Sequence, residues 1–197
     1  MARATDHIDE QLAAWLGAQP LFFVASAPLS ESGHVNVSPK SGAGTLRVLG
    51  PTSVGYLDLN GSGSETIAHI RENGRVTVMF CAFAGPPRIM RLYGRGSFHL
   101  PSDPEWAELR GKFDPPAETA PLVRAIVTIE IDRVQDSCGY VVPYMQVVGE
   151  RPHMQHWAAE RERKDGPCWD VKYRNEKNVR SIDGLPAIPH APIPDDE

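Results

Sequence analysis

The sequence predicts a mainly β protein with a few helices, folded as a single antiparallel barrel. Its 197 residues suit one domain, because a core of this size can bury around 70% of the unfolded chain's surface. About seven short stretches have the composition of strands, with tight turns between most of them. Alternating strand and helix units, which would indicate a parallel sheet, are missing, so the pattern favours a closed antiparallel barrel.

A helix precedes the first strands. Apolar residues recur at steps of three and four from Ile8 to Leu16, which predicts an amphipathic helix over residues 6–17. Gly17 and Pro20 end it. Four predicted strands follow, bounded by Gly, Pro and Ser, at residues 21–26, 34–38, 45–49 and 54–59.

The stretch from residue 54 to residue 98 is the most informative part of the chain. It has a strand, a Gly and Ser turn, one short helix and two further strands joined by a double proline. Ser62 to Glu65 fit the S-x-x-E capping box, and Asn73 with Gly74 end the helix. The unpaired N–H groups at such a helix start can hold an anion such as a phosphate. Capped connecting helices are commoner than phosphate sites, however, so the turn alone leaves both readings open.

The remainder of the chain predicts a helix from about residue 102 to 112, strands at 124–134 and 139–143, and a charged helix at 153–164. Four prolines fall among the last dozen residues, so we expect an extended tail that lies on a neighbour or in solvent. The predicted division is a barrel over residues 1–145, followed by a C-terminal helix and Pro-rich tail over 146–197 that packs on the barrel or on a partner subunit.

Composition excludes several classes of protein. The chain has 20 basic and 25 acidic residues, a net charge of −5, so no overall positive field exists to hold a nucleic acid. No apolar run approaches the ~20 residues of a membrane span, and the first residues include acidic side chains where a signal peptide needs basic ones. The three cysteines are widely spaced and indicate neither a disulfide framework nor a zinc site. We expect a cytoplasmic protein.

Several side chains could bind a ligand, although each has an ordinary alternative. Lys40 ends a predicted strand, where it is either solvated or available to a phosphate. Arg91, Tyr93 and Arg95 share one face of the strand near residue 93, and Gly94 and Gly96 on the other face suggest close approach by a flat ligand or a second subunit.

Other reactive side chains give weaker signals. His153 and His156 have a spacing that can bind a metal from one helix face, but no third ligand accompanies them. Cys138 has nothing visible that would lower its pKa. No nucleophile elbow, P-loop or dinucleotide fingerprint occurs.

The order of these motifs resembles a known family. SPK at residues 38–40, YLDLNGSGSETIAHIRENGRVTVMF at 56–80 and RLYGRG at 91–96 are similar to the pyridoxamine 5'-phosphate oxidase-like flavoproteins. The similarity covers about residues 8 to 135. It implies an FMN-binding split β-barrel that forms a homodimer with the cofactor at the subunit interface and acts on a small molecule.

The resemblance also implies site residues. Asn36 to Ser38 would lie near the flavin ring and Lys40 near the ring or the phosphate. The stretch from Asp58 to Ser64 would follow the ribityl chain, Ser64 to Thr66 would hold the phosphate, and Arg91 would reach the cofactor from the same or the other subunit. The full predicted cofactor set is Asn36, Val37, Ser38, Lys40, Asp58, Leu59, Asn60, Ser62, Gly63, Ser64, Glu65, Thr66, Arg71 and Arg91.

Two departures from the family pattern matter. The oxidases usually carry an arginine and a lysine after the serine of the turn, whereas this chain has Glu65 and Thr66, so Lys40, Arg71 and Arg91 are the available substitutes. The chain also lacks the arginine-rich C-terminal substrate segment, which argues against oxidation of pyridoxamine phosphate. We therefore expect an FMN-dependent oxidoreductase with an unidentified substrate and unassigned catalytic residues; Tyr93, Arg95 and Tyr140 are candidate substrate contacts. The alternatives are a non-catalytic protein that stores or senses a flavin, a deazaflavin or haem, and, more weakly, a metal protein built on His153 and His156.

Overall fold

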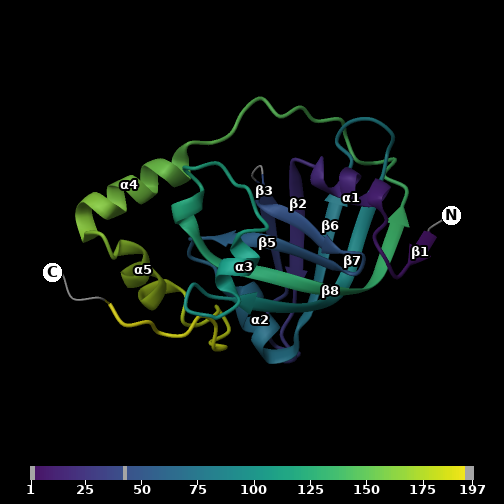
Figure 1. Ribbon diagram of the computed structural model, residues 1–197. Coiled ribbons are helices and arrows are strands. Elements are labelled where there is room, and N and C mark those ends of the chain that lie inside the picture. The colour runs from purple at the N-terminus through teal and green to yellow at the C-terminus, as the bar shows by residue number, and fades with distance from the viewer. Residues whose placement is uncertain (1–2, 42–43, 194–197) are drawn as a thin grey trace.

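A computed structural model describes residues 3–41 and 44–193. Most of this part of the chain is a series of strands that helices interrupt at a few places (Figure 1). The elements are β1 Arg3–Thr5, α1 Glu10–Gly17, β2 Leu21–Ser26, β3 Asn36–Ser41, β4 Leu46–Gly50, β5 Ser53–Leu59, α2 Glu65–Asn73, β6 Arg75–Cys81, β7 Ile89–His99, α3 Trp106–Arg110, a 3-10 turn Ala120–Leu122, β8 Val123–Ser137, α4 His153–Asp165 and α5 Trp169–Lys177. None of the helices in these residues is long and apolar enough to cross a bilayer.

The strands form one antiparallel sheet in the order β3-β2-β6-β7-β8-β5-β4, and β1 adds to β8. The sheet curls because β7 and β8 are long, with 11 and 15 residues, and their register shifts at Tyr93 and Gly94. The sheet path ends at β3 and β4, so the barrel is split. This confirms the predicted fold class, a mainly β, single-domain split barrel.

The core fills the inside of the curl. Alternate side chains of the strands point inward, as Phe22 and Val24 do on β2 and Met90 and Leu92 on β7, and each is at most 3% exposed. α1 covers one end with Leu16, which is fully buried. Burying a side chain of this size contributes about 1.5 to 3 kcal/mol.

The two glycines of β7 are explained by packing within the chain. A Cβ on Gly94 would lie 2.0 Å from the Glu130 carbonyl oxygen of β8, and one on Gly96 would lie 2.8 Å from Ile70 Cδ1 of α2. The prediction that these glycines admit a flat ligand or a second subunit is therefore wrong. β8 and α2 of the same chain approach closely there.

The first helix and one predicted strand differ from the structure. α1 begins at Glu10 rather than residue 6, because Asp9 is the N-cap and its carboxylate accepts a hydrogen bond from Leu12 N at 2.7 Å. Residues 139–143 are not a strand. β8 already pairs with β5 and β7, and Val141 is 91% exposed, so neither pairing nor burial stabilises a further strand there. We call residues 138–152 the arch, because they cross over the top of the sheet from β8 to α4 (Figure 1).

The C-terminal region is more ordered than its prolines suggest. The tail expected to be extended begins at residue 170, but residues 170–177 belong to α5, because Trp169 and Tyr173 pack edge-on against Trp157 of α4. The chain then runs along α2 as the C-terminal segment, which we define as residues 178–188, and buries Ala187 and Ile188 against Ile67 and Ala68 of α2. Residues 194–197 of the predicted tail lie outside the described residues.

Candidate functional site

A buried carboxylate joins two cations beside the start of α2. Asp58, on β5, is 3% exposed. Its Oδ1 accepts a hydrogen bond from Lys40 Nζ at 2.7 Å, and its Oδ2 accepts one from Arg124 Nε at 2.8 Å. We call Lys40, Asp58 and Arg124 the charged cluster. Burial alone would raise the pKa of Asp58, but Lys40 and Arg124 outweigh it and lower the pKa to about 2.

The strands bring these three residues together. Arg124 is the second residue of β8, and β8 pairs with β5 so that Ala125 lies opposite Asp58. Lys40 is near the end of β3, where alternate side chains point toward the site. Its ammonium also lies 5.6 Å from the centre of the Tyr56 ring. Burial raises the pKa of the Tyr56 hydroxyl well above its usual range, and the hydroxyl has no hydrogen-bond partner among the described residues.

The glycine turn before α2 is held from two sides. Arg124 donates from Nη1 to Gly61 O at 2.8 Å and from Nη2 to Gly63 O at 2.5 Å. Asn178, fully buried in the C-terminal segment, donates from Nδ2 to Gly61 O at 2.8 Å and to Ser62 O at 3.2 Å. The carbonyl groups of the turn are therefore fixed by side chains from β8 and from the far end of the chain.

The predicted capping box is wrong. Ser64 rather than Ser62 is the N-cap of α2, and its hydroxyl donates to Arg180 O at 3.0 Å instead of capping the helix. The Glu65 carboxylate accepts from Ile182 N at 3.3 Å, and although it lies beside Gly63 it accepts no hydrogen bond from the turn among the described residues. Within residues 3–41 and 44–193, the N–H groups of Glu65 and Thr66 have no hydrogen-bond acceptor. The start of α2 thus keeps open donors.

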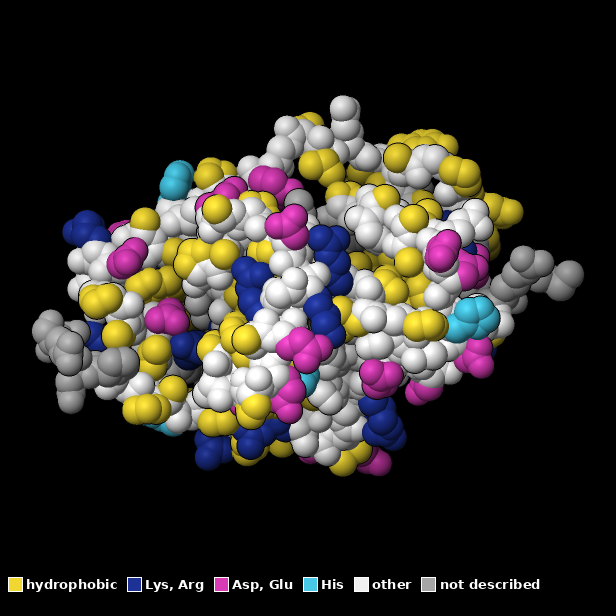
Figure 2. Space-filling view, in the orientation of Figure 1, with side chains coloured by type: hydrophobic (Ala, Val, Ile, Leu, Met, Phe, Trp, Pro, Cys, Tyr) yellow, Lys and Arg dark blue, Asp and Glu magenta, His cyan; other side chains and the backbone are white. Residues whose placement is uncertain are grey.

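These groups line a cavity of about 190 Å³. It is bounded by the cluster, the turn and the first turn of α2. Its lining residues are Ser38, Lys40, Asp58, Leu59, Gly61, Gly63, Ser64, Glu65, Thr66, Ile67 and Arg124. We call this cavity of about 190 Å³ the polar cavity. On the face of the molecule that Figure 2 shows, Lys and Arg side chains gather near the middle, with Asp and Glu side chains among them.

The polar cavity fits a phosphate group through its donors rather than its net charge. The two cations of the cluster are balanced by Asp58 and by Glu65, which also lines the cavity. An ammonium has three N–H donors and a guanidinium five. Lys40 uses one of them and Arg124 three in the bonds above, so each keeps two for a ligand. With the open N–H groups of α2, they form a set suited to an anion with several oxygens.

The structure brings many of the predicted cofactor residues to this place. Asn36 donates to Thr66 Oγ1 at 3.0 Å and to Ser38 Oγ at 3.2 Å, which ties β3 to α2. Leu59 lines the cavity, and Asn60 is buried beside it with its side-chain oxygen unpaired among the described residues. Val37 points to the opposite face of β3 and is 59% exposed, while Ser62 is exposed on the turn.

Two predicted arginines lie elsewhere. Arg71 donates to the Ala187 carbonyl oxygen, so it holds the C-terminal segment to α2. Arg91 lies on the outer face of β7 and donates to Ser137 Oγ at 3.4 Å. Neither lines the polar cavity, and contact of Arg91 with a cofactor from a partner subunit stays a prediction.

Sequence reasoning missed Arg124 and Asn178. Arg124 could have been found from its position at the start of an otherwise apolar strand. A basic side chain in a buried strand needs a charged partner, so this position indicates a buried ion pair. Asn178 gave no such signal, since only the fold brings residue 178 to the turn. The candidate substrate contacts are scattered: Tyr93 borders a groove on the outer sheet face, Arg95 donates to Asn73 O, and Tyr140 is exposed on the arch.

The structure adds no third ligand to His153 and His156 for the alternative of a metal-binding protein, among the described residues. His153 and His156 are both exposed on α4. In the described part of the chain, no group of three His, Cys, Asp or Glu side chains could hold a metal ion.

Comparison with known proteins agrees with this fold. The sequence model of the family described as pyridoxamine 5'-phosphate oxidase matches residues 8–138. The pyridoxamine 5'-phosphate oxidase family protein ustO of Aspergillus flavus is 38% identical in an alignment 197 residues long that covers 93% of this chain and 76% of that protein.

Solved structures show more distant similarity. A HupZ variant from Group A Streptococcus aligns with a TM-score of 0.49 and 19% identity over 66% of this chain and 99% of that one. An FMN-binding protein from Syntrophomonas wolfei subsp. wolfei aligns with a TM-score of 0.46 and 14% identity over 62% and 80% of the two chains. The family match spans most of the chain and includes strands β2 to β8, the turn and α2. This chain belongs to the pyridoxamine 5'-phosphate oxidase family.

Proposed function

We propose that the protein binds FMN, with the phosphate in the polar cavity, and that it is an oxidoreductase acting on a small molecule. The observation that carries the proposal is the charged cluster beside the open start of α2. A phosphate there would accept hydrogen bonds from Lys40, Arg124 and the N–H groups of Glu65 and Thr66. Each bond to a charged donor contributes about 1.5 to 3 kcal/mol.

Each part of the cluster has a separate task. Asp58 fixes the direction of Lys40 and Arg124, because each of its oxygens accepts from one of them. Arg124 also holds the turn carbonyls of Gly61 and Gly63, so one side chain both shapes the cavity and faces the ligand. When bound, FMN supplies hydride or single-electron transfer, and the protein supplies binding and orientation.

A non-catalytic carrier or sensor of a flavin, a deazaflavin or haem is the second candidate function. One observation favours it: the ionisable side chains that line the polar cavity are all engaged. Lys40, Asp58 and Arg124 bind one another, and Glu65 accepts from the C-terminal segment. None of these described groups is free to act as a general acid or base. Catalysis would need proton transfer by the substrate, by water or by a residue of a partner subunit.

We further propose a homodimer. Val37 and the arch residues Tyr140, Val141 and Val148 are 59%, 82%, 91% and 96% exposed, and large apolar side chains exposed to this degree are often covered in an interface. A second copy of the chain would cover them and could bring its Arg91 toward the cofactor. Cys81, Cys138 and Cys168 are free thiols, which agrees with the cytoplasmic location that we expect.

The visible spectrum of the purified protein, followed by reduction with a nicotinamide cofactor and reoxidation in air, tests the function. A flavin spectrum that bleaches and returns over repeated cycles supports the oxidoreductase. Bound flavin that is never reduced by the nicotinamide cofactor favours the carrier. Colourless protein that ignores added FMN overturns the cofactor proposal. Sedimentation measures the mass, and a monomer at micromolar concentration contradicts the dimer.

A further inference from the structure

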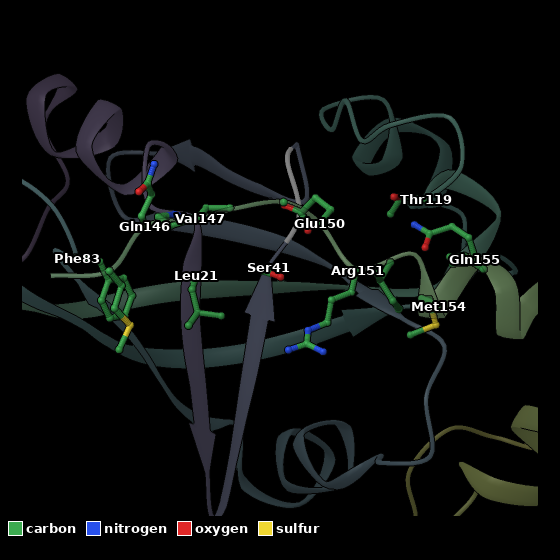
Figure 3. A pocket seen from close by; sticks show the side chains of 15 residues that line it. Leu21, Ser41, Phe83, Thr119, Gln146, Val147, Glu150, Arg151, Met154 and Gln155 are labelled. Atoms are coloured by element: carbon green, nitrogen blue, oxygen red, sulfur yellow. The ribbon is translucent and has the colours of Figure 1, made fainter. Parts of the chain in front are cut away.

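A second, larger cavity lies beneath the arch. Its volume is about 480 Å³, within the range of sites for small molecules. The walls come from the start of β2, the end of β3, the 3-10 turn and the first turn of α4 (Figure 3). Its lining residues are Pro20, Leu21, Ser41, Leu59, Phe83, Thr119, Leu122, Met145, Gln146, Val147, Gly149, Glu150, Arg151, Met154 and Gln155. We call it the arch cavity.

The arch cavity adjoins the polar cavity. Leu59 lines both, and Ser41 in one directly follows Lys40 in the other. The match to the family's sequence model ends at residue 138, before the residues of the arch and α4 that cover this cavity. Its roof is therefore a feature of this chain's own C-terminal part and is suited to setting specificity.

The lining of the arch cavity is largely apolar and contains one basic residue, Arg151. Figure 3 shows the Arg151 guanidinium reaching below the arch into the space between the end of β3 and α4. Arg151 is an exposed residue of this lining, and among the described residues it has neither a hydrogen bond nor an ion pair to another side chain. An unpaired guanidinium beside apolar walls is a site for an anionic group on an otherwise apolar molecule.

Two further groups at the same place point to a ligand. Gln155 lines the cavity, and its Oε1 is buried without a partner in the described part of the chain. Because α4 begins at His153, the N–H groups of Met154 and Gln155 also have no acceptor within the described ranges. A bound molecule with one anionic group and hydrogen-bonding atoms would satisfy them.

We propose that the arch cavity binds an apolar monocarboxylate. The carboxylate pairs with Arg151 at the start of α4, and the hydrocarbon part lies against Leu21, Phe83 and Met154. Glu150 also lines the cavity, so the lining holds one acidic and one basic residue, and a phosphate dianion is disfavoured relative to a single negative charge. Naming this ligand as the substrate rests on the proposed flavin function; the binding itself does not.

Calorimetric titration with 4-phenylbutyrate and 4-phenylbutan-1-ol tests the proposal. The two probes share a carbon skeleton and differ in the carboxylate. We expect wild-type protein to bind one equivalent of the acid about tenfold more tightly than the alcohol. Arg151→Gln should remove this preference and leave the affinity for the alcohol unchanged. Arg151→Lys should keep part of the preference, and Glu150→Gln should increase it.

The control is Arg163→Gln, which removes an exposed charge from α4 outside the cavity and should change neither affinity. Wild-type protein that binds neither probe, or binds both equally, overturns the proposal. So does Arg151→Gln protein with a native circular dichroism spectrum that still prefers the acid. The titrations are made with and without FMN, so loss of flavin binding and loss of acid binding are separate results.

Discussion

Arg124 donates from Nε to Asp58 Oδ2 at 2.8 Å, and the two side chains are only 5% and 4% exposed. A pair buried this deeply is costly to break, because the remaining charge cannot be solvated. The same guanidinium holds the turn before α2. Fold stability and the shape of the proposed phosphate site therefore depend on one residue.

Replacing Arg124 with Met should destabilise the protein by about 3 to 5 kcal/mol, since Asp58 then keeps only Lys40 as a partner. Urea unfolding measures the change. The control is Arg133→Met on the same strand, where the arginine is exposed and, among the described residues, bonds only to Gln135, and it should cost less than about 1 kcal/mol. Equal effects of the two substitutions would contradict the role assigned to Arg124.

Stability should fall in acid because of Asp58. Its pKa is lowered from 3.8 to about 2, so folding favours the ionised form. The resulting contribution, about 2 kcal/mol, is fully present above about pH 5 and is lost as the pH falls through the folded-state pKa of about 2. Urea unfolding at a series of pH values measures it. Asp58→Asn should flatten the profile in this window, and an unchanged profile would contradict the account.

Glu65→Gln should strengthen FMN binding about three- to tenfold, because it removes a negative charge from the lining of the polar cavity while keeping an oxygen that can accept from Ile182 N. Fluorescence titration with FMN measures the affinity. Glu72→Gln, on the same helix but outside the cavity, is the control and should have no effect. Weaker binding by Glu65→Gln protein would mean that the carboxylate positions the turn.

Gly94→Ala should prevent stable folding or cost several kcal/mol, because the new Cβ would meet the Glu130 carbonyl oxygen at 2.0 Å. Gly17→Ala, where nothing lies within 4 Å, should be neutral or slightly stabilising. Thermal unfolding compares the two variants. A Gly94→Ala protein as stable as Gly17→Ala protein would contradict the close approach of β7 and β8.

The sequence predicted the strands and α2 well, because alternation and terminal glycines are local signals. Gly74, for example, ends α2 with a φ of 72°, as its position suggested. Prediction from the sequence failed where contacts between residues far apart in the chain determine the local structure. Residues 139–143 have the composition of a strand but no free neighbour to pair with, and α5 is stabilised by Trp157 on another helix. The sequence predicted Glu65 to be a capping residue. Its carboxylate instead accepts a hydrogen bond from Ile182 N of the C-terminal segment, 117 residues away.

FMN titration of wild-type and Lys40→Ala protein is the most direct test of the proposed phosphate site. Lys40→Ala removes one of the two cations of the cluster, so we expect at least about tenfold weaker binding. Lys112→Ala, which removes an exposed lysine paired with Glu108 on the surface, should bind as wild type does. Wild-type protein that does not bind FMN, or Lys40→Ala protein that binds it with unchanged affinity, would contradict the account.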